Sequence, residues 1–222
     1  PDDFIDVVDF SITASGENFI TWSATHLDPI TDIQAALIKR SNTENNWQTE
    51  GPFVNNTQAR ATQPQLYTHK SSDIVYATWL QFDASPQPGQ FMISRYTPND
   101  GWETALSLGE TFNSQQVIMN ELGHAIILWQ SPADDATVEI HARSFDENGL
   151  SHMSNLVRGT SRQPVTSGPA MIPILTGLID SQGIKHIFWY EKQNSSDPEK
   201  RQYDFSLWHN TSPLKVLNTV FL

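Results

Sequence analysis

The sequence predicts an all-β protein made of four consecutive copies of one four-stranded unit. Apolar strands that end in tryptophan recur about 50 to 60 residues apart, and an alternating apolar-polar strand follows each of them. Helical periodicity is sustained nowhere, while 13 prolines and 11 glycines interrupt the chain where loops are expected. A chain of 222 residues can bury a substantial core, so we expect a single domain.

The tryptophan-ending strands are the second strands of the predicted units. They span 18–22, 75–79, 126–129 and 186–189. Glycine-containing turns precede three of them at matching distances, at 15–17, 122–124 and 182–184, whereas 71–73 replaces the turn in the second copy. A hairpin turn that leads into a buried strand explains this pattern. We therefore expect Trp22, Trp79, Trp129 and Trp189 to be buried at equivalent positions, in preference to serving as platforms that stack against sugars.

The third strands alternate and carry a repeated arginine. They are predicted at 33–40, 91–95, 138–143 and 203–209. Arg40, Arg95 and Arg143 each precede a closing apolar residue by the same interval, and the closing residues are Trp47, Trp102 and Leu150. Because the arginines recur at one position, we expect them to pair with a carboxylate or to cover a tryptophan. Trp47 and Trp102 are expected to pack at the turn that they close.

Inner strands at 8–14, 65–69, 116–120 and 171–178, with an outer strand after each closing residue, complete four antiparallel strands per copy. Such units are typical of β-propeller blades. The predicted blades of the single domain, 1–222, are 1–54, 55–110, 111–160 and 161–222. Two arrangements stay open: the four blades close on themselves, or they belong to a larger ring. An open ring would leave edges that invite self-association.

The amino-acid composition limits the classes of partner that the protein can bind. Twenty-five acidic against 13 basic residues give a net charge of −12, which repels nucleic-acid phosphates and anionic lipid surfaces, and no segment is apolar enough to insert into a membrane. The absence of cysteine rules out disulfides and thiolate metal sites. The acidic, lysine-poor composition favours an exported protein, extracellular, periplasmic or on the cell surface, although no signal peptide is visible in the chain.

The candidate ligand-binding residues lie in two sets of predicted loops that a propeller places around one end of its central channel. The first set is acidic and includes Asp83 and Asp134; the second contains Arg60, Arg158 and Arg162, close to the starts of the inner strands. Such arginines can hold a carboxylate or sulfate group. No calcium loop, nucleophile elbow, phosphate-binding loop or dinucleotide motif is present, so we predict no catalytic residue, no metal and no cofactor.

The blade pattern resembles the repeats of bacterial exported propellers and, more distantly, the sialidase and propeller-lectin group. The resemblance rests on four features of the repeat: the turn, the strand ending in tryptophan, the alternating strand with arginine, and the closing segment. The closing segments are Asn99-Asp100-Gly101-Trp102 and Glu147-Asn148-Gly149-Leu150. The sialidase Asp-box and arginine triad do not map onto these residues. The resemblance is one of architecture and does not specify an activity. From the architecture and the lack of catalytic motifs we expect a non-catalytic binding or scaffolding module that recognises a glycan or a protein through propeller loops. The alternative is a sialidase-like glycoside hydrolase that uses loop carboxylates.

Overall fold

A computed structural model describes ten segments of the chain: residues 3–28, 31–41, 46–50, 60–82, 89–111, 115–132, 137–146, 149–162, 175–192 and 203–209. Within these segments the protein is all-β, built from four antiparallel sheets and containing no helix. The chain forms two compact units, of which the first is mainly residues 1–110 and the second is mainly residues 111–222.

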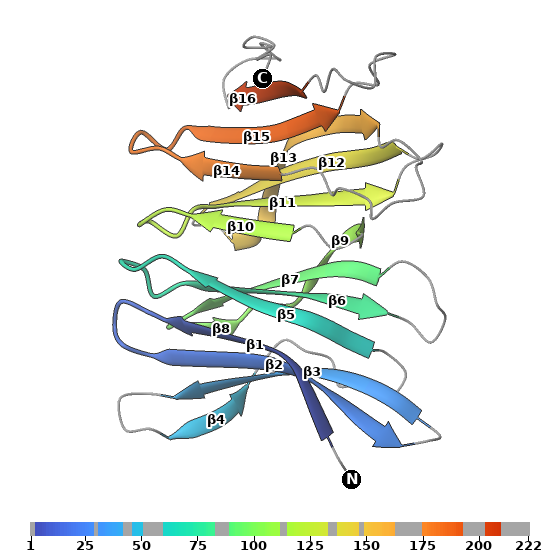
Figure 1. The fold of residues 1–222 in the computed structure, drawn as a ribbon. Helices are drawn as coiled ribbons and strands as arrows, with labels where there is room; N and C mark the ends of the chain where they lie inside the picture. Colours follow the sequence, from blue (N-terminus) through green and yellow to red (C-terminus); the bar gives the residue numbers. More distant parts are fainter. Residues whose placement is uncertain are drawn as a thin grey trace. The chain divides into compact units, whose positions relative to one another are not determined.

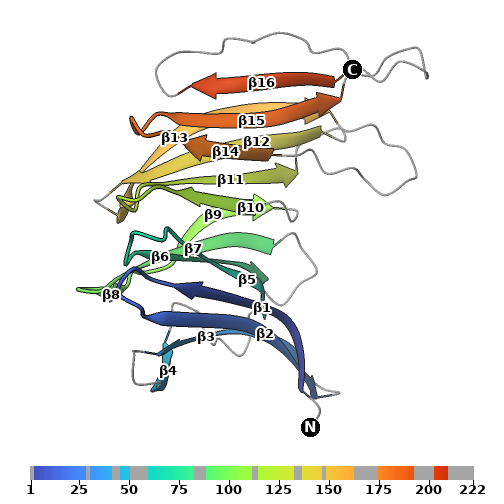
Figure 2. The ribbon, with the colours of Figure 1, turned by 60° about the vertical axis from the view of Figure 1, so that its left-hand side comes forward.

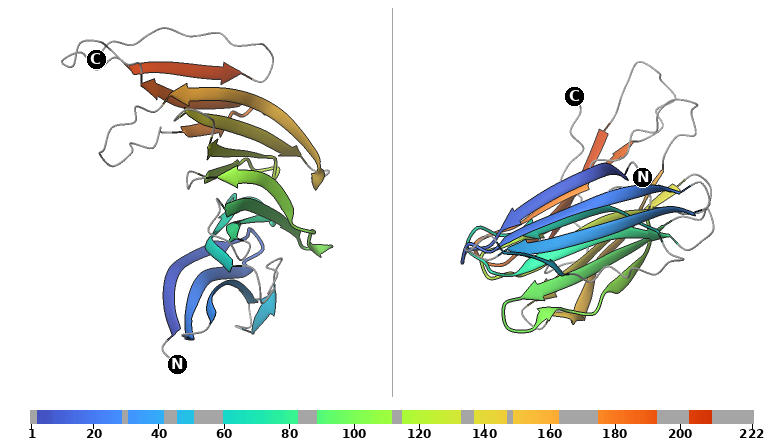
Figure 3. Two further views of the ribbon diagram at one scale, coloured as in Figure 1. Left: turned by 90° about the vertical axis from the view of Figure 1, so that its right-hand side faces the viewer. Right: turned by 90° about the horizontal axis from the view of Figure 1, so that it is seen from below.

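The first sheet has the strand order β1-β2-β3-β4 (Figure 1). Its strands are β1 Asp3–Ile12, β2 Asn18–Asp28, β3 Thr31–Ser41 and β4 Trp47–Glu50. A bulge interrupts the register of β1 against β2 between Ile5 and Val7. The strands β1 to β3 curve together, as Figure 3 shows, which agrees with the added twist that bulges give to a strand.

The second sheet, in the same unit, has the order β5-β6-β7-β8, and β9 also pairs with β7. Its strands are β5 Arg60–Thr68, β6 Val75–Phe82, β7 Gly89–Thr97, β8 Gly101–Trp102 and β9 Leu106–Thr111. β5 is irregular between Thr62 and Gln65, and Gln63 adopts a positive φ of 51° there. This sheet has five strands instead of the expected four, because the outer edge is divided between β8 and β9.

The third and fourth sheets lie almost entirely in the second unit. The third has the order β10-β11-β12-β13, and the fourth has the order β14-β15-β16; their strands are labelled in Figure 2. The strands are β10 Gln115–Met119, β11 Ala125–Pro132, β12 Thr137–Asp146, β13 Gly149–Arg162, β14 Leu175–Ile179, β15 Lys185–Lys192 and β16 Tyr203–His209. A fourth strand for the last sheet would fall outside the described residues.

The first hairpin of each sheet ends in a tight turn, and three of these turns share one construction. Gly16, Gly123 and Gly183 have positive φ values of 88°, 78° and 78°, a conformation that costs glycine least. Three residues before each glycine, a side-chain oxygen of Thr13, Asn120 or Asp180 accepts a hydrogen bond from the N–H that follows the glycine, at 2.9–3.0 Å. The sequence prediction of three glycine turns is confirmed.

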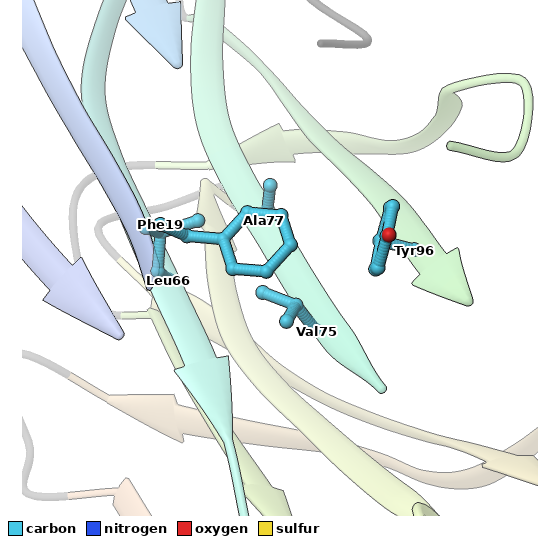
Figure 4. Packing of buried hydrophobic residues seen from close by; sticks show 5 residues of the cluster. All are labelled: Phe19, Leu66, Val75, Ala77 and Tyr96. Carbon is cyan, nitrogen blue, oxygen red and sulfur yellow. The ribbon is translucent and has the colours of Figure 1, made fainter. Parts of the chain in front are cut away.

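The core of the first unit fills the space between its two sheets. Phe19 on β2 packs with Leu66, Val75, Ala77 and Tyr96 of the second sheet, and these side chains are all less than 7% exposed (Figure 4). The rings of Phe19 and Tyr96 meet edge to face, with centroids 4.9 Å apart. Residues 19, 21 and 23 of β2 therefore face the second sheet, and residues 18, 20 and 22 face away from it.

The core of the second unit is aliphatic. Its buried cluster combines the third sheet with one side of the fourth, and consists of Ile126, Leu128, Ala142 and Ile187, with Ile118 and Ile179 packed against it. Residue 177 of β14 is a glycine, and a Cβ there would lie 2.7 Å from the carbonyl oxygen of His186 and 3.2 Å from Ile118. Glycine at this position therefore allows β14 to approach both neighbours closely.

The repeated tryptophans are not equally buried. Trp79 and Trp129 are 0% and 1% exposed, as predicted, and Trp102 packs against the cluster around Phe19. The prediction is wrong for Trp22, which is only half-buried because it lies on the face of the first sheet that points away from the second. It is also wrong for Trp47, which is 43% exposed. The side chain of Trp189 lies outside the described residues.

Candidate functional site

The predicted ligand-binding residues are distributed over both units. Arg60 is the first residue of β5 and pairs in register with Phe82 at the end of β6. Arg158 and Arg162 lie on β13. The prediction that the three arginines belong to loops is therefore wrong, because β5 already begins at residue 60 and β13 continues through residue 162. Since Arg60 belongs to the first unit and the other two arginines to the second, neither unit by itself unites the three.

The two predicted acidic residues, Asp83 and Asp134, lie outside the described residues. Their role in a ligand site stays a prediction. Where the structure does describe His, Asp and Glu side chains, it contains no group of three or more that could hold a metal ion. The described residues contain no helix that is long and apolar enough to cross a membrane.

Arg40 takes part in a three-membered polar network between the first and second sheets. Its Nη1 donates to Glu17 Oε1 at 3.0 Å and to the Tyr96 hydroxyl at 2.6 Å, and that hydroxyl donates to Glu17 Oε2 at 3.2 Å. The guanidinium also lies over the Tyr96 ring, 5.4 Å from its centroid. The network therefore connects the first hairpin turn and β3 of one sheet with β7 of the next.

The other two repeated arginines are held within their own sheets. Arg95 is 6% exposed, and its Nη1 donates to Glu103 Oε1 at 3.2 Å. Arg143 lies over the Trp129 ring at 5.2 Å, and burial lowers the pKa of its guanidinium. His141 stacks on that tryptophan, with centroids 4.9 Å apart and an interplanar angle of 14°. Pairing with a carboxylate and covering a tryptophan, the two structural roles that the sequence analysis predicted, are both observed.

A carboxylate that sequence reasoning missed joins the inner strands of the first two sheets. Asp9 on β1 accepts hydrogen bonds from the Leu66 N–H through Oδ2 and from the Phe10 N–H through Oδ1, both at 2.8 Å. The register places Gln65 at the matching position of β5 and Gln116 at that of β10. A comparison of the inner strands, residue by residue, would have shown this repeated polar position.

Tyr67, on the same strand as Gln65, makes a side-chain hydrogen bond within the second sheet. The Tyr67 hydroxyl donates to Gln65 Oε1 at 2.5 Å. Burial, with a smaller contribution from the negative charge of Asp9, raises the pKa of the Tyr67 phenol. The phenol is therefore a neutral hydrogen-bond donor at physiological pH and is not poised to release a proton.

The last described hairpin turn contains a carboxylate and an imidazole in contact. His186 Nε2 lies 3.1 Å from Asp180 Oδ2, while Asp180 Oδ1 accepts the N–H groups of Gln182 and Ile184, each at 2.9 Å. The hydrogen bond with His186, assisted by the two backbone N–H groups, lowers the pKa of Asp180. Since both carboxylate oxygens already have partners within the hairpin, the pair serves to close the turn.

One surface of the first sheet exposes large apolar side chains. On β1, Val8, Phe10 and Ile12 are 59%, 50% and 50% exposed, and Ile20 and Trp22 of β2 lie beside them in register, half-buried. We call these five residues the outer face of the first sheet. A contiguous apolar surface of this kind is a mark of an interaction site.

Comparison with known proteins gives a likeness of fold alone. No family model matches the chain, and no curated protein matches it. A protein of unknown function from Dyadobacter fermentans is 11% identical over 90% of this chain, with a TM-score of 0.54; the chain spans about half of it, 51%.

Two glycoside hydrolases are among the other similar structures. One is a family 117 enzyme of the marine bacterium Zobellia galactanivorans, 11% identical over 99% of this chain and 71% of that one, with a TM-score of 0.49. Another is the α-L-arabinofuranosidase of Podospora anserina, 11% identical over 97% of this chain and 68% of that one, with a TM-score of 0.38. The TM-score of 0.54 indicates that this chain shares an architecture of antiparallel sheets with the Dyadobacter protein, and the 11% identity shows a likeness of fold alone.

Proposed function

We propose that the chain is a β-propeller scaffold of about four blades that recognises a glycan through its loops, with a protein partner as the other possibility that the sequence analysis raised. The observation that supports this is the use of the repeated side chains. Arg40, Arg95 and Arg143 contact carboxylates or rings inside the scaffold, and Trp79 and Trp129 are buried. Recognition then falls to residues that differ from copy to copy, which in repeat proteins gather in the loops.

Arg60, at the start of β5, and Arg158 and Arg162, near the end of β13, are our proposed contacts for anionic groups of the ligand. In a chain with a net charge of −12, a few local arginines can select a carboxylate or sulfate through paired hydrogen bonds. The same net charge disfavours nucleic acid and membrane surfaces as partners. We also propose that the protein works outside the cytoplasm, where such glycans are exposed.

A glycan array probed at two ionic strengths tests this proposal. Binding of sulfated or uronic-acid glycans by the wild type should fall as salt rises and should be lost in the variant Arg158→Ala/Arg162→Ala. The matched control is Lys70→Ala, which removes a cation from an exposed position of the second hairpin turn. Binding that is unchanged in the double variant and insensitive to salt would contradict the assignment of these arginines.

A glycoside hydrolase is the second candidate function. The similar structures whose names state an activity include glycoside hydrolases, although TM-scores of 0.49 and 0.38 carry no argument for activity in this chain. Under this hypothesis two carboxylates of the acidic loop set, to which Asp83 and Asp134 belong, would supply the acid and the base or nucleophile, which retaining and inverting hydrolases hold about 5 to 10 Å apart. Turnover of chromogenic glycosides by the wild type, abolished in Asp83→Asn or Asp134→Asn, would establish the hydrolase and reject the non-catalytic module.

A further inference from the structure

Three equivalent inner-strand residues differ sharply in exposure. Phe10, Leu66 and Val117 each lie opposite the residue that stands two positions before the repeated tryptophan. Leu66 and Val117 are both 6% exposed, whereas Phe10 is 50% exposed. The exposure of the tryptophans on these faces differs in the same way, because Trp79 is fully buried and Trp22 is only half-buried. The outer face of the first sheet is therefore built like a covered face but lacks a cover within its unit.

The second sheet shows what covers a face of this kind. Phe19, from the opposite side of the first sheet, enters the surface formed by Leu66, Val75 and Ala77 (Figure 4). Backbone contacts accompany it at the turn, where the Ala14 N–H donates to the Ser72 carbonyl oxygen at 3.0 Å. A covering sheet thus contributes an apolar side chain near the start of its second strand and a hairpin turn that aligns with that of its neighbour.

The position of Phe19 recurs six residues after the turn residue that accepts the capping hydrogen bond. In the third sheet Ile126 occupies it and packs with Ile187 of the fourth sheet. In the fourth sheet it is His186, which pairs in register with Leu178 of β14. Leu178 is 43% exposed, while its neighbour Ile179 packs on the opposite side, against the cluster that includes Ile126. The side of the fourth sheet that bears Leu178 and His186 is therefore a covering side, and we call it the outer face of the fourth sheet.

We propose that two copies of this chain associate head to tail, with the outer face of the fourth sheet of one copy covering the outer face of the first sheet of the next. This arrangement repeats between molecules the sheet packing seen within each unit. The five residues that define the first-sheet face are uncharged, and the register places Leu37 and Lys39 of β3 beside Trp22 and Ile20, so none of these seven residues opposes a carboxylate of the other copy with a like charge. Such a contact is heterologous, and it produces either a closed ring of copies or an open series.

The size of the face predicts a weak association. β1 has 10 residues, so the face is about 33 Å long at a rise of ~3.3 Å per residue, and three long strands spaced ~4.8 Å apart make it about 14 Å wide. The two partners together then bury on the order of 900 Å², which is below the ~1,000 Å² expected of a stable specific interface and in the range of weak, transient contacts. We therefore expect copies to associate in a concentration-dependent manner, with a dissociation constant in the micromolar range or above.

Sedimentation velocity of the full chain over a range of concentrations tests the proposal. We expect the wild type to shift to larger species as concentration rises, and Phe10→Ser and Leu178→Ser each to weaken association on the order of tenfold or more. Leu122→Ser is the matched control: Leu122 is 64% exposed on a hairpin turn and belongs to neither face, so this variant should associate like the wild type. Circular dichroism establishes that each variant keeps its sheet content.

A mixing experiment distinguishes head-to-tail association from symmetric pairing. The Phe10→Ser chain keeps an intact fourth-sheet face, and the Leu178→Ser chain keeps an intact first-sheet face. An equimolar mixture of the two should therefore form dimers that grow no further, although each variant alone stays monomeric. Wild-type protein that is monomeric at all concentrations, or a Leu178→Ser chain that associates as strongly as the wild type, would overturn the proposal. None of these outcomes depends on whether the chain binds or hydrolyses a glycan.

Discussion

Replacing Phe19 by alanine should remove a large part of the stability of the first unit. Phe19 is fully buried, and its ring meets the rings of Tyr96 and Trp102 edge to face, at 4.9 and 6.0 Å between centroids. A phenylalanine side chain buries about 150–250 Å², which at ~25 cal/mol per Å² corresponds to roughly 4–6 kcal/mol as an upper limit. Measured Phe→Ala substitutions in cores cost about 3–5 kcal/mol. We expect the free energy of unfolding of this unit to fall by about 4 kcal/mol.

Urea denaturation of the wild type and Phe19→Ala, followed by tryptophan fluorescence, measures this difference through the shift in midpoint at constant slope. Trp102 is a suitable reporter because it packs against the altered cluster. Leu122→Ala, at a position that is 64% exposed, serves as the control and should change stability by no more than about 0.5 kcal/mol. A loss below about 1 kcal/mol for Phe19→Ala would refute the view that this ring holds the two sheets together.

Three further predictions concern turns and charges. Gly123 and Gly183 share a φ of 78°, but a Cβ at residue 123 would lie 2.3 Å from the side chain of Ile74, whereas a Cβ at residue 183 would touch nothing. Urea denaturation should therefore show that Gly183→Ala lowers the free energy of unfolding by about 1 kcal/mol and that Gly123→Ala lowers it clearly more. Equal losses would contradict this. The His186 hydrogen bond lowers the pKa of Asp180 below 3.8, so the stabilisation from its carboxylate is complete above pH 3.8 and is lost as pH falls through the lowered pKa. When the free energy of unfolding is measured from pH 2 to 6, the wild type should show this acid-dependent loss and Asp180→Asn should not. The same pH profile in both proteins would contradict the prediction. Glu103→Gln removes the negative charge 3.2 Å from the buried Arg95 guanidinium, which should cost about 1–3 kcal/mol in thermal or urea unfolding. No measurable loss would show that this charge does not contribute to stability.

Periodicity predicted the strands because it depends on neighbours within one sheet. The third strand of the fourth copy was predicted at residues 203–209, and β16 Tyr203–His209 has these bounds. The three glycine turns could also be predicted from the sequence, since the positive φ at Gly16, Gly123 and Gly183 is a requirement of the turn itself. Outer edges were less predictable: β8 has two residues and β13 has 14, and their lengths depend on what each edge pairs with.

Burial and site geometry depend on contacts between sheets, which the pattern of a single strand does not contain. Trp22 and Trp79 end similar strands, yet only Trp79 is fully buried because only its face is covered within the first unit. Asp9 escaped attention for the same reason, since its partner, the Leu66 N–H, lies 57 residues away in another sheet. Arg60, Arg158 and Arg162 were grouped by loop position, and the structure places all three on strands, Arg60 at the start of β5 and the other two on β13.

The shared turn construction has a consequence for the order of folding. Each capping hydrogen bond joins residues only four positions apart, so the first hairpins of the first, third and fourth sheets can close on the microsecond scale before any sheet meets another. Packing of Phe19 against the second sheet requires closure of a much longer loop and should follow later. Substitutions at the turn glycines are then expected to slow the folding rate, whereas substitutions between sheets should mainly accelerate unfolding, so that stopped-flow kinetics would separate the two kinds of contact.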